Sequence, residues 1–246
     1  MGYWRLPLLL LAPVLIIAMF AKEGGVVSLL WDPMAMIVVV PGSLLATFIP
    51  APVDAIRHLR HALLHLPADH HYAMEQLASR LMEWGNTRRR KGNPGLETLL
   101  HAEQDGFCQR ALQLMVDGHP PADIRQALEN ELLYRQSRDQ QALALLGNLA
   151  GYLPTLGIVG AVLGLIQVLS GISNPDTLAQ GIATAFVATF YGVALSNLVV
   201  LPLQQYAQHR LGVQQQFYWA LLQGVDDLLH GSNPAAIVDR IRVWHQ

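Results

Sequence analysis

The stretch YLPTLGIVGAVLGLIQVL, residues 152–169, decides how the rest of the sequence is interpreted. It contains no charged side chain, and a Pro and a Thr stand near its start. Glycines recur at Gly157, Gly160 and Gly164. An apolar segment of this length predicts a membrane-spanning helix, and its small residues predict a close neighbour, because they let two helix backbones approach.

Composition places the chain among membrane proteins. It is 246 residues long, 52% hydrophobic and 14% charged, with a mean hydropathy of +0.29, whereas about a quarter of the residues in a soluble domain are charged. The formal net charge of -2 argues against a nucleic-acid partner. The single cysteine, Cys108, cannot form a disulfide within the chain. Between Ala150 and Leu203 the only formal charge is Asp176, so membrane and water-exposed parts alternate.

Apolar stretches at 6–21, 33–49, 149–169 and 178–203 are the candidate membrane spans. A second apolar stretch follows the first at once, so we interpret the first as a span rather than as a signal peptide. The last two are separated by a short turn rich in Gly, Asn and Pro, which predicts a helical hairpin. In the second, Asp32 is the expected cap and Pro33 the first helical residue, and a kink is expected at Pro41 and Gly42.

Arg and Lys are concentrated in the middle of the chain and in its tail. The positive-inside rule then places both termini and the middle segment in the cytoplasm. Amphipathic patterns such as YAMEQLASRLMEW and PADIRQALENELLYRQ predict helices in that segment, with a break at KGNPG, and Asn233 or Ser232 is the expected cap of the last helix in the tail. The sequence thus predicts an all-α integral membrane protein: four transmembrane helices, a helical cytoplasmic domain between spans 2 and 3, and a helical cytoplasmic tail. The expected divisions are 1–50, 51–147, 148–203 and 204–246.

Small residues spaced four apart mark one face of each of the last two spans. They are Gly157 and Ala161, Gly160 and Gly164 on the third span, and Thr184, Ala188, Gly192 and Ser196 on the fourth. In lipid, apolar side chains gain little by leaving the solvent, so helices associate through such faces. The pattern predicts either packing of these two helices against each other, or the lining of a cavity that another chain fills.

The four spans contain no internal Asp, Glu, Lys, Arg or His. An ion pathway through a membrane needs an ionisable side chain at depth, because a charge in hydrocarbon is costly. If the chain belongs to an ion-driven machine, a partner must therefore supply the carboxylate. Thr155, Thr189 and the carbonyl freed by Pro154 would then offer polar contacts around the ion.

Several motifs resemble one known family. LPTLGIVGAVLGLIQVL followed by GIATAFVATFYGVALSNLVVLPL resembles the third and fourth spans of the MotA/PomA flagellar stator proteins, within the MotA/TolQ/ExbB superfamily. GGVVSLLWDPMAMIVVVPGSLLATFI is similar to their second span, and RRRKGNPGLE and LQLMVDGHPPADIRQALENEL to their cytoplasmic domain. The resemblance covers nearly the whole chain.

This resemblance implies a multi-pass subunit of the bacterial inner membrane. It implies a homo-oligomer, a pentamer in the family, around a dimer of MotB-type single-span subunits whose transmembrane Asp carries the ion. It also implies contact with membrane lipid and with the rotor protein FliG, and no resident cofactor. A TolQ/ExbB-type energiser of outer-membrane processes is the alternative, although that type has one span before its cytoplasmic domain, where this chain is predicted to have two.

Individual positions carry further implications of the resemblance. Pro154 and Pro202 match prolines that couple ion flow to movement, and Thr189 matches the Thr that faces the partner's Asp. Sodium-driven relatives have Thr where this chain has Ala161 and Ala188. A sodium ion needs several oxygen ligands and Ala supplies none from its side chain, so the proton is the expected coupling ion.

A basic stretch, TRRRK at 87–91, is the expected rotor contact. The family pattern of Arg, then Gly three residues on and Glu eight residues on, is met by Arg89, Gly92 and Glu97. Such charges face opposite charges on FliG in the family. The residues expected at this contact are Arg88, Arg89, Arg90 and Glu97. A solvated loop or a lipid-headgroup contact is the alternative, because exposed charge pairs are individually weak.

Histidines gather before the basic stretch, at His58, His61, His65, His70 and His71. A metal site there, and with it a membrane enzyme, is a third interpretation. No companion Cys or carboxylate set accompanies these histidines, and no nucleophile motif or phosphate-binding loop stands out. We therefore expect no metal and no enzyme activity.

Overall fold

The computed structural model describes residues 11, 14–15, 18–24, 30–64, 72–170 and 175–243. Within these ranges the chain is helical and contains no strand, which confirms the predicted all-α fold. The elements are α2 (Pro33–Phe48), α3 (Val53–Leu64), α4 (Met74–Lys91), η3 (Asn93–Leu96), α5 (Glu97–Ala102), α6 (Gly106–Val116), α7 (Pro121–Ser170), α8 (Pro175–Leu195), η4 (Ser196–Val200), α9 (Leu201–Leu229) and α10 (Pro234–Val243). The element η3 is a 3₁₀ helix, and η4 is a π-helix.

The chain divides into two compact units, each with its own hydrophobic core. Unit 1 comprises Met1–Leu64 and Gln140–Gln208, and unit 2 comprises His65–Asp139 and His209–Gln246. Helices α2, α3 and α8 belong to unit 1, whereas α4, α5, α6 and α10 belong to unit 2. Helices α7 and α9 contribute residues to both.

Two helical stretches of the described chain are long and apolar enough to cross a membrane: Pro121–Leu169 and Leu178–Leu229. Helices α2 and α3 form a pair bent by 117°, which makes a third span if the pair is taken as one. The predicted span at 6–21 falls largely outside the described residues and stays a prediction. The chain is thus a membrane protein, and four spans remain the expectation for it.

Helix α2 begins where the sequence predicts. Asp32 Oδ1 accepts hydrogen bonds from two backbone amides of the first turn, at 2.9 and 3.1 Å. Pro33 occupies the first turn, where its missing N–H costs no helical hydrogen bond. Pro41 stays inside the helix, which continues to Phe48, and the sharp change of direction comes at the break between α2 and α3.

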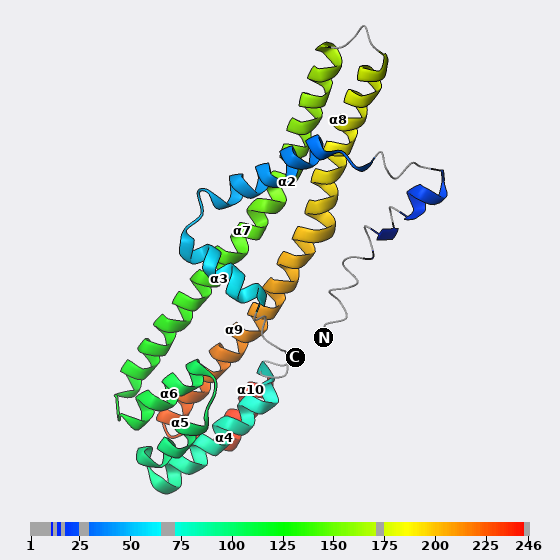
Figure 1. The fold of residues 1–246 in the computed structure, drawn as a ribbon. Coiled ribbons are helices and arrows are strands. Elements are labelled where there is room, and N and C mark those ends of the chain that lie inside the picture. The colour runs from blue at the N-terminus through cyan, green and yellow to red at the C-terminus, as the bar shows by residue number, and fades with distance from the viewer. Residues whose placement is uncertain are drawn as a thin grey trace. The chain divides into compact units, whose positions relative to one another are not determined.

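The core of unit 1 is built from small and aliphatic side chains. Helices α7 and α8 run side by side in this unit, and α2 packs against α8 (Figure 1). The buried residues include Ala35, Val39, Leu59, Ala142, Leu146, Ala150, Leu153 and Ala188. Other apolar side chains of α7, such as Ile158 and Ile166, are exposed, which is the expected state of a surface that faces lipid.

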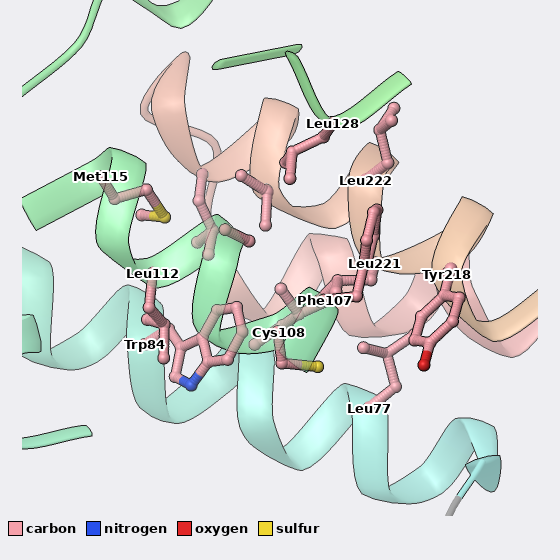
Figure 2. Close-up of a cluster of buried hydrophobic side chains, with 14 of the residues drawn as sticks. Leu77, Trp84, Phe107, Cys108, Leu112, Met115, Leu128, Tyr218, Leu221 and Leu222 are labelled. Carbon is pink, nitrogen blue, oxygen red and sulfur yellow. The ribbon is translucent and has the colours of Figure 1, made fainter. Parts of the chain in front are cut away.

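The core of unit 2 is built from larger side chains. Figure 2 shows Leu77 and Trp84 of α4 meeting Phe107, Cys108 and Leu112 of α6, with residues of α9 behind them. A polar pair lies beside this cluster, since the Tyr218 hydroxyl donates to Asp105 Oδ2 at 2.8 Å. Burial, followed by the nearby Asp105 and Glu103 carboxylates, raises the pKa of the Cys108 thiol well above its ordinary value.

Helix α4 ends at the break that the sequence predicts. Its C-cap residue, Gly92, has a φ of +71°, a backbone conformation that other L-residues rarely adopt. Pro94 follows within η3, where it cannot continue the α-helix. The basic residues 88–91 therefore form the last turn of α4, where positive charge is favourable against the helix dipole.

Candidate functional site

The small-residue faces of α7 and α8 pack against each other within this one chain. A Cβ atom added at Gly192 would lie 2.5 Å from the carbonyl oxygen of Leu153, and one added at Gly164 would lie 2.9 Å from that of Gly181. One at Gly160 would lie 2.8 Å from the Cβ atom of Ala188. These approaches confirm the packing interpretation of the glycine spacing, because real Cβ atoms do not come so close to a backbone.

Pro154 leaves a carbonyl of α7 without its helical donor, and a serine supplies a replacement. A proline has no N–H, so the carbonyl four residues earlier, that of Ala150, loses its partner. The Ser196 hydroxyl donates to the Ala150 oxygen at 2.7 Å, and Ser196 is 2% exposed. The carbonyl that the sequence offers as an ion contact thus already accepts one hydrogen bond within this chain.

A π-turn precedes the second proline. The Leu201 amide donates to the Ser196 carbonyl, one residue further back than in an α-helix. Pro202 follows immediately, and its ring would clash with the carbonyl four residues earlier in a regular helix. The wider turn gives the chain a way to pass Pro202 without ending the helix, so α8, η4 and α9 follow one another without a gap.

The other predicted path residues take different environments. Thr155 is exposed, and its hydroxyl donates to the Tyr152 carbonyl of its own helix at 2.8 Å. Thr189 is half-buried and donates to the Ala185 carbonyl at 3.1 Å. Both hydroxyls thus have lone pairs left to accept a further hydrogen bond. Ala161 is half-buried, and Ala188 is fully buried.

A polar cluster at the start of α2 is a feature that the sequence analysis did not assemble. The Thr184 hydroxyl donates to Asp32 Oδ2, and the Tyr191 hydroxyl donates to the Leu30 carbonyl. Asp32 was expected only as a cap and Thr184 only as a small residue. Their separation of 152 residues explains why spacing along the chain could not join them.

The basic end of α4 is partly committed to contacts inside unit 2. Arg88 Nη1 donates to the Leu228 carbonyl, and Arg88 Nε donates to Asn93 Oδ1 at 3.0 Å. Arg89 Nη2 donates to the carbonyls of Gly231 and Ser232, at 3.3 and 3.0 Å. Arg88 therefore binds the last turn of α9, and Arg89 binds the turn between α9 and α10.

A glycine lets that turn approach α4. A Cβ atom added at Gly85 would lie 2.7 Å from side-chain atoms of both Leu228 and Pro234. Gly85, Arg88 and Arg89 follow one another at helical spacing, so one face of α4 carries both the close approach and the hydrogen bonds. Pro234 begins α10 and Asn233 caps it, accepting from an amide of the first turn at 3.2 Å, as the sequence predicts.

The remaining charged candidates point to solvent. Arg90, Lys91 and Glu97 are all exposed, and Glu97 stands in the first turn of α5. Of the expected rotor residues, Arg89, Arg90 and Glu97 are thus exposed and Arg88 is half-buried, but Arg89 also donates to the α9–α10 turn. In the described part of the chain no group of three or more His, Cys, Asp or Glu side chains is placed to hold a metal, and His65, His70 and His71 lie outside that part.

The chain is similar to motility proteins over most of its length. It is 28% identical to motility protein A of Bacillus subtilis over 237 residues, 94% of this chain and 88% of that protein. It is 25% identical to the chemotaxis protein PomA of Vibrio alginolyticus over 217 residues, 87% of this chain and 84% of that protein.

Solved structures and a family model agree with these relatives. The flagellar MotAB stator complex from Bacillus subtilis matches with a TM-score of 0.81 and 28% identity, over 94% of this chain and 92% of the matched chain. The fold is also that of MotAB from C. jejuni, with a TM-score of 0.90. A model of the MotA/TolQ/ExbB proton channel family matches residues 100–218. The family model, the motility relatives and the stator structures together support the MotA/PomA type, within the MotA/TolQ/ExbB proton channel family.

Proposed function

We propose that this chain is a MotA-type stator subunit of the bacterial flagellar motor, which converts ion flow into torque together with a MotB-type partner. The similarity to the MotAB stator complex from Bacillus subtilis, at 28% identity over 94% of this chain, is the observation that carries the proposal. The motility relatives named above favour this function over a TolQ/ExbB-type energiser.

The partner supplies the acid in this mechanism. Between Ala150 and Ser170 and between Leu178 and Leu203 the sequence contains no Asp, Glu, Lys, Arg or His, and the carbonyl freed by Pro154 already accepts a hydrogen bond from Ser196. A proton crossing the membrane beside these helices needs a carboxylate, because an unpaired charge there is costly. That group belongs to the single-span partner.

Complementation tests the function. The chain, expressed with its cognate MotB-type partner in a strain that lacks its own stator, restores swimming in soft agar. The matched control carries Asn in place of the partner's transmembrane Asp and does not swim. Absence of swimming with the intact partner, when both proteins are present in the membrane, contradicts the proposal.

Protons are the proposed coupling ion. Ala161 and Ala188 offer no side-chain oxygen, and Ala188 is fully buried against Gly160, which leaves no room for a ligand at that position. Swimming speed should follow the proton motive force and stay unchanged when sodium is added at constant proton motive force. A rise in speed with sodium contradicts this choice.

We assign the rotor contact to the exposed charges at the start of α5 and the end of α4. The positive-inside rule places both termini and unit 2 in the cytoplasm. The membrane is proposed to be the bacterial inner membrane. Arg90→Glu and Glu97→Lys should each reduce swimming, and charge reversal on FliG should restore it. Arg110→Glu, an exposed site on α6, is the control. Normal swimming of both variants removes the residues from the contact.

The assembly is proposed to be a pentamer around two partner chains. Exposed apolar side chains on α7, such as Val162 and Ile166, leave surface for neighbouring copies or lipid. Native mass spectrometry of the purified complex should give five copies of this chain for two of the partner. Another ratio contradicts the pentamer while leaving the stator function in place.

A further inference from the structure

One buried hydrogen bond connects two places in unit 1 where the regular α-helical hydrogen-bond pattern is interrupted although the helix continues: Pro154 in α7, and the π-turn before Pro202. These two places are called breaks below. The Ala150 carbonyl has no helical donor because of Pro154, and the Ser196 hydroxyl bonds to it at 2.7 Å. Ser196 is also the first residue of the π-turn that leads to Pro202, since its own carbonyl accepts from the Leu201 amide. The same residue thus serves the break in α7 with its side chain and the break before α9 with its backbone.

Close packing makes this bond possible. A serine hydroxyl reaches a short distance, so the two backbones must nearly touch where it acts. Gly192 lies one helical turn before Ser196, and a Cβ atom there would meet the Leu153 carbonyl at 2.5 Å. Ser196 is 2% exposed, so in an apolar surrounding water does not replace its hydroxyl.

We propose that Ser196 is a positioning residue of the stator, whose hydroxyl latches the Pro154 break of α7 to the π-turn before Pro202 so that the two breaks move together. Its importance for coupling rests on the proposed stator function. Without the hydroxyl, the Ala150 carbonyl is left unsatisfied and the two breaks are free to change shape separately.

Hydrogen exchange on the complex of this chain with its MotB-type partner tests the bond through the backbone amides around it. In Ser196→Ala, peptides that cover 150–158 and 196–202 should exchange on the order of tenfold faster, because an unsatisfied buried carbonyl destabilises the packed helices and their amides open more often. Ser43→Ala is the matched control: Ser43 is equally buried, but its hydroxyl bonds to the Val39 carbonyl of its own helix at 2.6 Å. Val39 keeps a backbone donor in α2, so exchange there should change little.

A double variant separates the latch from general loosening of the core. In Pro154→Ala the backbone amide at 154 returns and satisfies the Ala150 carbonyl, so adding Ser196→Ala should accelerate exchange no further. Ser196→Thr keeps a hydroxyl and should retain more protection than Ser196→Ala. Unchanged exchange in Ser196→Ala, or effects of the two substitutions that simply add, overturns the latch.

A functional measurement then separates positioning from assembly. Ser196→Ala should enter the membrane and bind the partner as the wild type does, yet its rotation speed for a given proton flow should fall severalfold. Full speed at full flow overturns the coupling role. A wild-type chain that fails to restore swimming overturns the proposed function instead, and the exchange measurements still decide whether the latch exists.

Discussion

The contact between α7 and α8 in unit 1 and the contact of α4 with the α9–α10 turn in unit 2 are built from different parts. In unit 1, missing side chains let backbones meet, and a hydroxyl satisfies a backbone carbonyl. In unit 2, large side chains fill a core and arginines donate to helix-end carbonyls at its edge. Burying an apolar side chain against protein gains little free energy in lipid, so close backbone approach and satisfied polar groups hold helices together there. In water, by contrast, burial of apolar area is itself the main stabilising contribution.

The largest expected effect tests the aqueous side of this comparison. Phe107→Ala should destabilise unit 2 by about 3–5 kcal/mol, because Phe107 is fully buried in its core and the substitution leaves a cavity. The loss of stability is measured as the denaturant concentration at which a protease cleaves half of the protein within residues 72–116. Leu133→Ala, at a half-exposed position of the same unit, is the control and should cost far less. Equal midpoints for the two variants contradict the assigned core.

A smaller effect tests the lipid side. Gly192→Ala places a Cβ atom 2.5 Å from the Leu153 oxygen and should destabilise the α7–α8 contact by about 1–3 kcal/mol. Gly151→Ala is the matched control, since nothing lies within 4 Å of its Cβ position, and it should be neutral or stabilising by up to about 1 kcal/mol. Heat resistance of the detergent-solubilised complex compares them. Equal resistance would mean that α7 and α8 do not pack as closely as described.

The pH dependence of unit 2 follows from the buried thiol. Burial raises the folded pKa of Cys108 above its ordinary value of 9.0, so above that pH the unfolded chain binds fewer protons than the folded one. Stability is intact below about pH 9 and should then fall by about 1.4 kcal/mol per pH unit from this group. The denaturation midpoint between about pH 8 and pH 10 measures the slope, and Cys108→Ala should flatten it. A wild-type midpoint that stays constant over this range contradicts the prediction.

The smallest effect distinguishes neighbours in the basic stretch. Arg88→Lys should destabilise the α9–α10 turn by about 1 kcal/mol, because one ammonium group cannot reach both Asn93 and the Leu228 carbonyl. Arg90→Lys should stay within about 0.5 kcal/mol, since Arg90 is exposed. Hydrogen exchange of 228–235 compares the two, and faster exchange in Arg90→Lys alone would reverse the assignment.

Local chemistry explains the features that the sequence predicts well. The Asp32 cap, the helix start at Pro33, the break at Gly92 and the cap at Asn233 all depend on residues within a few positions of one another. The all-α fold and the small-residue faces follow from patterns of the same range. Helix periodicity and turn residues are sufficient for such predictions.

Long-range partners were beyond the sequence. Ser196 is 46 residues from Ala150, and Arg88 is 140 residues from Leu228, so no spacing rule could pair them. The π-turn before Pro202 was also missed, because the rotation of later side chains that one extra residue causes can be recognised only in a helix with distinct polar and apolar faces. What the pattern did offer at Ser196 was a small polar residue on a glycine-containing face.

The buried thiol has a practical consequence. Cys108 is the only cysteine of the chain, it is fully buried, and its raised pKa keeps it in the unreactive thiol form at neutral pH. A cysteine introduced at an exposed position, such as that of Arg90 or Ile166, can therefore be labelled or cross-linked selectively in the otherwise native protein. Distances and neighbours in the assembled membrane complex can be mapped without first removing a native residue.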